Sequence, residues 1–396
     1  MRVVEPVTPV GGPVLPPPPA PLEDTPLSWR LWSRRDFWSD ELCPPKYILR
    51  IIQEGYRLPF VSYPPHTFRR NSRKCRGHED FIDSAIAALL ANGSIVEVAH
   101  QPRVVCSLSV DDSKAQLRLI YNAIPVNPHL FKERFRYESL NTLRDVLPRN
   151  GRLYQFDIHS AFPHIRVVRD HWGCLGFWWR GRWYVYCVLP FGLSTAPYVF
   201  TKVMRPLLAF WRARGTIVAM YLDDGVGAAA TEAKTRADAA LVQWTLRAAG
   251  FTAHATKSRW EPAASTDAFL GFSLDLVANL LGLKSTRVAK FAKAISALSR
   301  DRPIRRRTLA SLAGQLQSMA DVLGPVVRLH TRAIYVLGGG GVSASLGTPQ
   351  SSGQTRRGLR LSSGVAWLRL GSWPGRYPSG ARLSPRRSTW LAMLVT

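Results

Sequence analysis

Apolar residues recur every three to four positions from Glu79 to Ala91, and this spacing predicts an amphipathic helix. Asn92 and Gly93 end the helix, and a strand is expected from Ile95 to Val98. The same pattern predicts four further helices, at about 195–214, 232–249, 286–299 and 307–320. Shorter apolar runs predict strands at 153–156 and 268–272, and a hairpin around a glycine turn at 176–186.

One apolar run leads directly into two carboxylates. Residues 217–222 are mostly apolar, Asp223 and Asp224 follow, and Gly225 and Gly227 then let the chain turn back. This pattern predicts a β-hairpin with both aspartates at its tip. Adjacent aspartates on a rigid turn repel each other unless a cation lies between them, which suggests a divalent metal. Taken alone, the stretch fits a solvated loop equally well.

A third carboxylate, Asp157, favours the metal-binding interpretation over the solvated loop. Asp157 ends the predicted strand 153–156, and residues 189–197, which contain Leu-Pro-Phe-Gly, form a turn that opens a helix. A two-metal phosphoryl-transfer site needs carboxylates from two separate strands that meet at one edge of a sheet. The three segments in this order are far more specific than any one of them.

Together these segments resemble those of a reverse transcriptase. They are similar to the family's first catalytic-aspartate motif, its Leu-Pro-x-Gly motif and its Tyr-x-Asp-Asp motif, and the resemblance extends from about Ser28 to Tyr335. It implies an α+β right-hand polymerase fold with fingers, a palm carrying an antiparallel sheet, and a helical thumb. The stretch 54–60 and Phe191 further resemble DIRS-type (tyrosine-recombinase) retrotransposons.

The resemblance implies a division of the chain. The expected parts are a disordered proline-rich leader at 1–27, an N-terminal extension at 28–66, fingers at 67–150, a palm at 151–283 with a fingers hairpin at 166–190, a thumb at 284–337, and an atypical tail at 338–396. In the extension, Trp29, Trp32, Phe37 and Trp38 are expected to be core residues. The Arg-rich stretch 302–307 suits a thumb that grips a sugar–phosphate backbone, although a solvated linker would look the same.

The resemblance also assigns catalytic roles. Asp157, Asp223 and Asp224 would hold Mg²⁺ or Mn²⁺, with the backbone carbonyl of Ile158 as a further ligand. Lys257 is similar to a palm lysine that lies near the departing pyrophosphate and protonates it, a role that suits a compact ammonium group. The turn Leu270-Gly271-Phe272 resembles the family's primer grip. The alternative for this turn and for Lys257 is that they are ordinary surface and core positions.

Nucleotide contacts follow from the same resemblance. Lys114 and Arg118 are candidates for the triphosphate, and Phe191 borders the nucleotide and the template. Phe162 would exclude a 2′-hydroxyl and so select deoxynucleotides, because a flat ring leaves no room for one more oxygen. The alternatives are that the basic residues lie on a solvated face and that Phe162 is a core residue. Asn122 and Ile124 depart from the family pattern, which has an acidic residue and an arginine there.

Composition agrees with a nucleic-acid partner. The chain of 396 residues has a net charge of +26 and a pI near 10.7, which points to a polyanion such as a template–primer duplex. It has no uninterrupted apolar segment of 18 residues and no secretory signal, so we expect an intracellular protein of the cytoplasm or nucleus and no membrane partner. Its five cysteines are expected to be reduced, and Cys75-x-x-His78 has no second pair that would complete a zinc site.

The tail has a different character. No Asp or Glu follows Asp321 and no Lys follows Lys293. RNase H chemistry needs several carboxylates, so we expect no RNase H activity. An out-of-frame or decayed translation of a longer element would explain this composition.

The predicted function is therefore RNA-directed DNA synthesis by a retrotransposon enzyme, with dNTPs and a primed template as substrates. Three rival interpretations remain. They are an RNA-dependent RNA polymerase, which a bulky Phe162 argues against, a truncated relic that only binds nucleic acid, and a basic structural protein whose Asp-Asp loop is incidental. Oligomeric state and template preference are left open.

Overall fold

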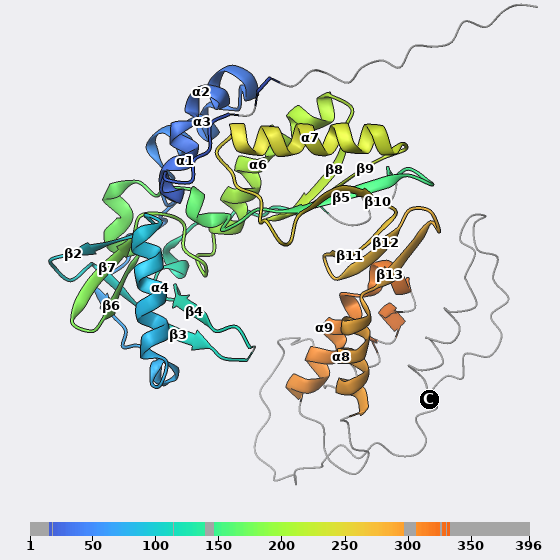
Figure 1. Ribbon diagram of the computed structural model, residues 1–396. Coiled ribbons are helices and arrows are strands. Elements are labelled where there is room, and N and C mark those ends of the chain that lie inside the picture. The colour runs from blue at the N-terminus through green and yellow to red at the C-terminus, as the bar shows by residue number, and fades with distance from the viewer. Residues whose placement is uncertain are drawn as a thin grey trace, which may run out of the picture. The chain divides into compact units, whose positions relative to one another are not determined.

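A computed structural model describes residues 16–17, 19–113, 115–138, 146–296, 306–324, 327–329 and 331–332 (Figure 1). The chain divides into two compact units, the first formed by 1–270 with 274–280 and the second by 271–273 with 281–396. Residues 1–15 and 18 of the leader predicted at 1–27, the tail at 338–396 and most of the Arg-rich stretch lie outside the described residues. Helices and strands alternate irregularly, which makes the protein α+β.

The first unit begins with a short helical segment. It comprises α1 (Leu27–Ser33), α2 (Arg35–Phe37), the π-helical turn η1 (Trp38–Leu42) and α3 (Lys46–Glu54). The indole of Trp38 is fully buried and donates to the Ala249 carbonyl at 2.9 Å. The Leu27 amide donates to the Asn92 carbonyl at 3.0 Å. Sequence-distant parts of the chain are thus joined through this segment.

Two aromatic residues of this segment were predicted wrongly. Trp29 and Trp32 are 45% and 37% exposed rather than core residues. The guanidinium groups of Arg166 and Arg35 lie over their rings, each 4.2 Å from the ring centroid. A cation above an indole face gives these exposed rings a favourable partner without burial.

The first sheet is mixed and has six strands. Its strands are β1 (Thr67–Phe68), β2 (Ile95–Val98), β3 (Val104–Asp111), β4 (Arg118–Asn122), β6 (Gly176–Trp179) and β7 (Arg182–Tyr186), in the order β1-β3-β6-β7-β2 with β4 also paired to β3. Helix α4 (Glu79–Ala91) precedes β2, as the apolar spacing predicted. The β6–β7 turn is Arg180-Gly181, both with positive φ, which is the geometry that a two-residue hairpin turn requires.

The second sheet is antiparallel, with the order β10-β5-β9-β8. Its strands are β5 (Arg152–Asp157), β8 (Ile217–Tyr221), β9 (Asp224–Ala229) and β10 (Arg259–Ala263). Helices α6 (Ala196–Ala213) and α7 (Glu232–Ala248) lie along this sheet in Figure 1. Both helices agree with the predicted ranges to within two residues.

Stacked aromatic rings on β5 and β10 explain the glycines of β9. The rings of Phe156 and Trp260 are parallel within 6°, with centroids 5.6 Å apart. A Cβ atom at Gly225 would lie 2.2 Å from the Phe156 ring, and one at Gly227 would lie 2.2 Å from the Tyr154 ring. The prediction that Gly225 and Gly227 let the chain turn back is therefore wrong. Both glycines lie inside β9, where they leave room for aromatic rings of the neighbouring strand β5.

Short 3₁₀ helices connect these elements in the described part of the chain. They are η2 (Arg73–Cys75), η3 (Asn127–His129), η4 (Phe162–His164) and η5 (Arg169–Cys174). Cys75 of η2 is buried, and its thiol donates to the Leu108 carbonyl at 3.3 Å.

The chain then forms a three-stranded sheet in the order β11-β12-β13, and the division into units falls within it. The strands are β11 (Ser265–Phe269), β12 (Phe272–Asp275) and β13 (Leu280–Leu283). Leu270 and Gly271 have positive φ and reverse the chain, so a continuous strand at 268–272 is wrong, whereas the turn predicted at 270–272 is present.

The second unit continues with α8 (Ser285–Ser296), α9 (Arg306–Gln317) and α10 (Ala320–Leu323). Phe291, Leu312 and Met319 form its small buried core. Both predicted helices are present over their described parts, and 297–305 lies outside them. None of the helices in the described ranges has an apolar stretch long enough to cross a bilayer.

Candidate active site

The β8–β9 hairpin presents the two adjacent aspartates. Tyr221 pairs with Asp224, so the two turn residues are Leu222 and Asp223. Leu222 has a φ of 56°, in the left-handed region where a hairpin of this type usually has glycine. Its side chain packs against the core cluster instead of turning to solvent. The hairpin was predicted correctly, and its turn is a strained one held by packing.

The third aspartate lies directly across the sheet from this hairpin. Asp157 at the end of β5 pairs in register with Asp224. The amide of Ile158 donates to the Asp223 carbonyl at 2.9 Å, which extends the pairing by one residue. The three carboxyl-bearing residues therefore share one end of the antiparallel sheet, as the sequence predicted.

Lys257 binds the most buried of these carboxylates. Its Nζ lies 3.2 Å from Oδ1 and 3.3 Å from Oδ2 of Asp157, whose exposed fraction is only 6%. The loop that carries the lysine is held by two contacts. His254 donates its amide to the Asp157 carbonyl at 2.7 Å, and the Ser258 hydroxyl accepts from the Asp157 amide at 3.2 Å.

Negative charge is crowded at this end of the sheet. Burial, and then the neighbouring carboxylates of Asp223 and Asp157, raise the pKa of Asp224 to about 6. Burial likewise raises the pKa of Asp223. Both shifts mean that ionising these carboxyls is unfavourable here unless positive charge is nearby.

The donor chemistry fits a hard divalent cation. Carboxylate oxygens are the ligands that Mg²⁺ prefers, and one of the three carboxylates already has a cation, the Lys257 ammonium, in contact. Within the described ranges, no three His, Cys, Asp or Glu side chains are close enough together to enclose an ion.

The raised pKa of Asp224 predicts a stability gain on neutralisation. Its folded-state pKa of about 6 exceeds the ordinary value of 3.8, so the folded form binds the proton more tightly. Its contribution to stability is therefore lost as the pH rises from about 4 through 6. In EDTA at pH 7.5, Asp224→Asn is expected to raise the unfolding free energy by about 1–2 kcal/mol, after discounting for partial solvent access.

Thermal unfolding of both proteins between pH 5 and pH 8 measures this effect. The gain should shrink below pH 6, and Asp36→Asn, a change at an exposed aspartate of α2, should show no such trend. Equal or lower stability of Asp224→Asn at pH 7.5 would contradict the prediction.

Comparison with known proteins finds a family that part of this chain resembles. Residues 97–274 match the family model described as reverse transcriptase (RNA-dependent DNA polymerase). The matched range contains Asp157, Asp223, Asp224 and Lys257. Over residues 97–274, the chain is therefore similar to reverse transcriptases.

Curated relatives are polyproteins of mobile elements and viruses. The Tf2-3 transposon polyprotein of Schizosaccharomyces pombe (strain 972 / ATCC 24843) is 23% identical over 179 residues, which are 45% of this chain and 12% of the relative. The genome polyprotein of Petunia vein clearing virus is 32% identical over 91 residues, 23% of this chain and 4% of the relative. The chain thus spans a small part of the length of these relatives.

Solved structures show the fold. A foamy viral protease-reverse transcriptase (dRH) in complex with double-stranded DNA matches with a TM-score of 0.56 at 17% identity, covering 82% of this chain and 58% of the other. The foamy viral protein with an RNA/DNA hybrid matches with a TM-score of 0.54 at 18% identity, covering 72% and 37%. The predicted right-hand polymerase fold is confirmed.

Within the matched range, the side chain of Asn127 fastens the Leu-Pro-Phe-Gly loop. The Asn127 side chain donates to the Gly192 carbonyl at 3.0 Å and accepts from the Ser194 amide at 2.8 Å. Gly192 has a φ of 93°, and a Cβ there would lie 2.7 Å from the Tyr121 carbonyl oxygen. The loop therefore depends on a glycine at its closest approach to β4.

Phe162 and Phe191 lie together beside this loop. Their ring centroids are 4.9 Å apart; Phe162 is 8% exposed and Phe191 is 63% exposed. Phe162 also meets the ring of Phe200 at 5.8 Å. Phe162 is therefore a core residue on one side, while its neighbour Phe191 reaches solvent.

The predicted triphosphate ligands are not joined to the carboxylates by any contact in the described ranges. Arg118 is exposed at the start of β4, opposite Asp111 in the β3–β4 hairpin. Lys114 lies outside the described residues. Ile158 is buried beside Asp157, where its backbone could serve an ion.

Sequence reasoning missed the residues that fasten the site. Asn127, His254 and Ser258 act through contacts with residues 65 to 101 positions away, or through backbone groups. None of them belongs to a motif that a single sequence displays. An Asn directly before Pro128 predicts only a local turn.

Proposed function

We propose that this chain is an RNA-directed DNA polymerase of a retrotransposon, which extends a primer with dNTPs. The observation that carries the proposal is the meeting of Asp157, Asp223 and Asp224 at one sheet end inside the range that matches the reverse transcriptase family model. The resemblance of 54–60 and of Phe191 favours an element of the DIRS type. Within this proposal, 67–150 are fingers, 151–283 palm and 284–337 thumb.

The chemistry that we assign to the site is phosphoryl transfer with two divalent ions. Asp157 and Asp223 would hold Mg²⁺ or Mn²⁺, with Asp224 completing the acidic cluster and the Ile158 carbonyl as a further ligand. When bound, the ions supply positive charge where the attacking and leaving oxygens become negative. The antiparallel sheet contributes a rigid frame, since Asp157 and Asp224 are fixed in register by the strand pairing.

Lys257 would protonate the leaving pyrophosphate. Its ammonium lies at the carboxylate edge and carries transferable protons. Its side chain is 59% exposed, and an exposed ion pair contributes little free energy. The Lys257 ammonium could therefore leave Asp157 and contact a phosphate oxygen instead.

The net charge of +26 supports a polyanionic partner, which we propose to be a primed RNA or DNA template. The foamy viral proteins that share the fold were solved with an RNA/DNA hybrid and with double-stranded DNA. Arg306 and Arg307 at the start of α9 are exposed and would contact backbone phosphates.

Selection of deoxynucleotides is assigned to Phe162. Replacing Phe162 by valine is expected to lower the preference for dTTP over UTP by about tenfold or more, because a smaller side chain admits the 2′-hydroxyl. The measurement is the ratio of the two incorporation rates within one protein, so a general loss of activity cancels. Phe200→Val loosens the same core and should leave the ratio unchanged. An unaltered ratio in Phe162→Val would assign Phe162 to the core alone.

A second candidate is a relic that binds nucleic acid without catalysis. The ion pair of Lys257 with Asp157 favours it, since this carboxylate is already balanced by a cation.

Primer extension tests the proposal. The full chain is given poly(rA)·oligo(dT), dTTP and Mg²⁺, and a matched reaction contains EDTA. Extension that requires Mg²⁺ establishes the polymerase. Extension with UTP in place of dTTP would indicate an RNA polymerase. Salt-sensitive duplex binding without extension would establish the relic.

A further inference from the structure

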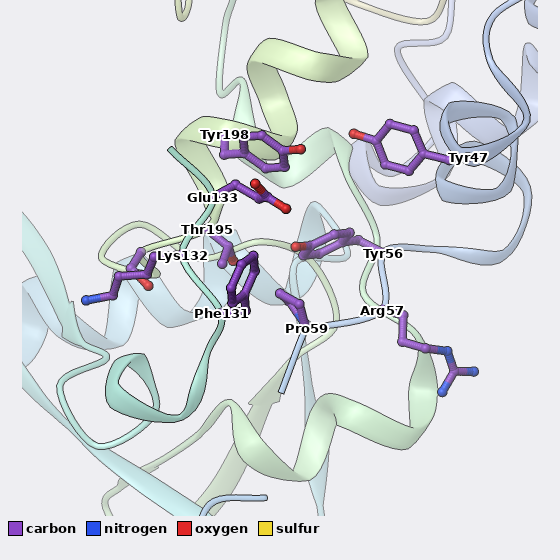
Figure 2. A pocket seen from close by; sticks show the side chains of 10 residues that line it. Tyr47, Tyr56, Arg57, Pro59, Phe131, Lys132, Glu133, Thr195 and Tyr198 are labelled. Carbon is purple, nitrogen blue, oxygen red and sulfur yellow. The ribbon is translucent and has the colours of Figure 1, made fainter. Parts of the chain in front are cut away.

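A pocket of about 360 Å³ lies near the Leu-Pro-Phe-Gly loop, apart from the carboxylates (Figure 2). Aromatic rings make its walls, contributed by Tyr47 of α3, Tyr56, Phe131 and Tyr198 of α6. Three segments that are distant in the sequence therefore build one open aromatic pocket, in which Tyr47 and Phe131 also face solvent.

The walls of the pocket are fixed by backbone hydrogen bonds. The Tyr56 amide donates to the Arg166 carbonyl at 2.7 Å, and the Tyr56 carbonyl accepts from the Val168 amide at 3.1 Å. The Phe131 amide donates to the Pro59 carbonyl at 2.8 Å. A pocket that is already formed loses little conformational entropy when a ligand enters.

The base of the pocket contains hydroxyl groups without partners. Thr195 is the N-cap residue of α6 and is 4% exposed, yet its side chain makes no capping hydrogen bond. The hydroxyls of Thr195 and Ser194 are buried, and neither forms a hydrogen bond of ordinary geometry within the described residues. Although Tyr56 and Thr195 have neighbouring hydroxyls, their geometry falls short of a bond. Buried hydroxyls usually have partners, so these two point to an absent ligand.

The pocket also contains one carboxylate. Figure 2 shows the Glu133 carboxylate among the rings of Tyr47, Tyr56 and Tyr198. Glu133 is an exposed residue, so its carboxylate is open to a ligand that enters from solvent. Burial raises the pKa of Tyr56 to about 12, so its phenol stays a donor at neutral pH. A flat ligand that offers N–H donors to a carboxylate suits this lining.

Cations flank the mouth of this pocket. Arg57 and Lys132 line the pocket, and in Figure 2 both side chains extend away from its centre. This arrangement suits a ring that enters while its phosphates stay outside. Unpaired bases are commonly recognised in this way, by stacking on aromatic side chains and by hydrogen bonds to their edges.

We propose that this pocket binds the guanine base of an unpaired nucleotide in a nucleic-acid strand, with Glu133 accepting from N1–H and the 2-amino group. Among the common bases only guanine presents two adjacent N–H donors from different nitrogens to a single carboxylate. The Thr195 and Ser194 hydroxyls are then the partners for its acceptor atoms. This inference rests on the proposed function only for the nucleic-acid strand that supplies the guanine. Binding of guanine does not require the polymerase reaction itself.

Oligonucleotide binding to the full chain tests this inference. Fluorescence anisotropy compares ten-nucleotide oligo(dT) strands whose central position is dG, deoxyinosine or dA. Deoxyinosine differs from dG only by lacking the 2-amino group. We expect the dG strand to bind at least about tenfold more tightly than the deoxyinosine strand. Equal affinities for the three strands would overturn the proposal.

Two glutamate variants locate the preference. Glu133→Gln is expected to reduce the dG-to-deoxyinosine ratio to within about threefold, with affinity for plain oligo(dT) retained. Glu97→Gln removes the same charge at a partly exposed glutamate that pairs with Arg182, and should leave the ratio intact. A ratio that persists in Glu133→Gln would place guanine recognition elsewhere and overturn the assignment to this pocket.

Two further measurements show whether the pocket takes guanine from a free nucleotide, a DNA strand or an RNA strand. Competition by guanosine monophosphate at the affinity of the strand would show that the pocket takes the free nucleotide, and this would overturn the assignment to a strand. The same oligonucleotides made as RNA show which strand is preferred. Asp223→Asn should keep the guanine preference whether or not the wild-type chain extends primers, so failure of the polymerase and failure of the pocket are separate results.

Discussion

Asp223→Asn is expected to lower primer extension by about a thousandfold, with duplex binding retained. An asparagine keeps the size of the side chain but removes the charge that would hold a divalent ion, and such electrostatic groups commonly contribute two to three orders of magnitude to the rate. Asp157→Asn should lose as much, because its carboxylate faces the same sheet end from β5. Extension rates on poly(rA)·oligo(dT), measured beside duplex affinity, give the comparison.

The matched control is Asp36→Asn, on the surface of α2, which should extend primers like the wild-type chain. The double variant Asp157→Asn with Asp223→Asn should be no slower than either single change, since the carboxylates act as one unit. Extension within tenfold of wild type in Asp223→Asn would remove the hairpin from the catalytic site.

Gly227→Ala is expected to destabilise the fold by about 3 kcal/mol. The added methyl group would lie 2.2 Å from Cζ and 2.3 Å from the hydroxyl oxygen of Tyr154, which is fully buried and cannot swing aside. Chemical denaturation with tryptophan fluorescence measures the loss.

Two further variants show whether the ring is the cause. Combining Gly227→Ala with Tyr154→Leu removes the clashing atoms, so the loss in the double variant should fall short of the sum of the single losses by about 1 kcal/mol or more. Gly173→Ala, at a glycine where an added methyl group would meet no atom within 4 Å, should change stability by less than about 1 kcal/mol. Strict additivity of Gly227→Ala and Tyr154→Leu would refute the ring contact.

The placement of the three aspartates at one sheet end could be predicted because the sequence signals for it are local. Asp223 and Asp224 follow an apolar run in a turn, and Asp157 ends another strand, so each signal lies within a few neighbouring residues. The roles of Gly225 and Gly227 could not be predicted in this way. They are set by the rings of β5, some 70 positions earlier, and a glycine after an aspartate looks the same whether it makes a turn or admits a ring.

The helices and strands around the site likewise divide into those that local sequence predicts and those that depend on distant parts of the chain. Helices α4, α6 and α7 were predicted from periodicity, since a buried face imposes its own spacing on the sequence. The strand at 268–272 was predicted wrongly because apolar residues flank a turn whose left-handed residues, Leu270 and Gly271, differ little from a strand in composition. Asn127 and the aromatic pocket depend on segments that meet only in the folded chain.

The N-terminal segment packs against the part of the chain that matches the family model, so the folded unit begins earlier in the sequence than the match. The family match begins at residue 97, yet Trp38 is fully buried against Ala249 and Phe251, and Arg30 donates to the Thr252 side chain at 2.7 Å. A fragment that starts at residue 97 would therefore expose the apolar surface that Trp38 covers, beside the loop that holds Lys257. The smallest polypeptide that folds as described should begin near residue 27, some 70 residues before the family match begins.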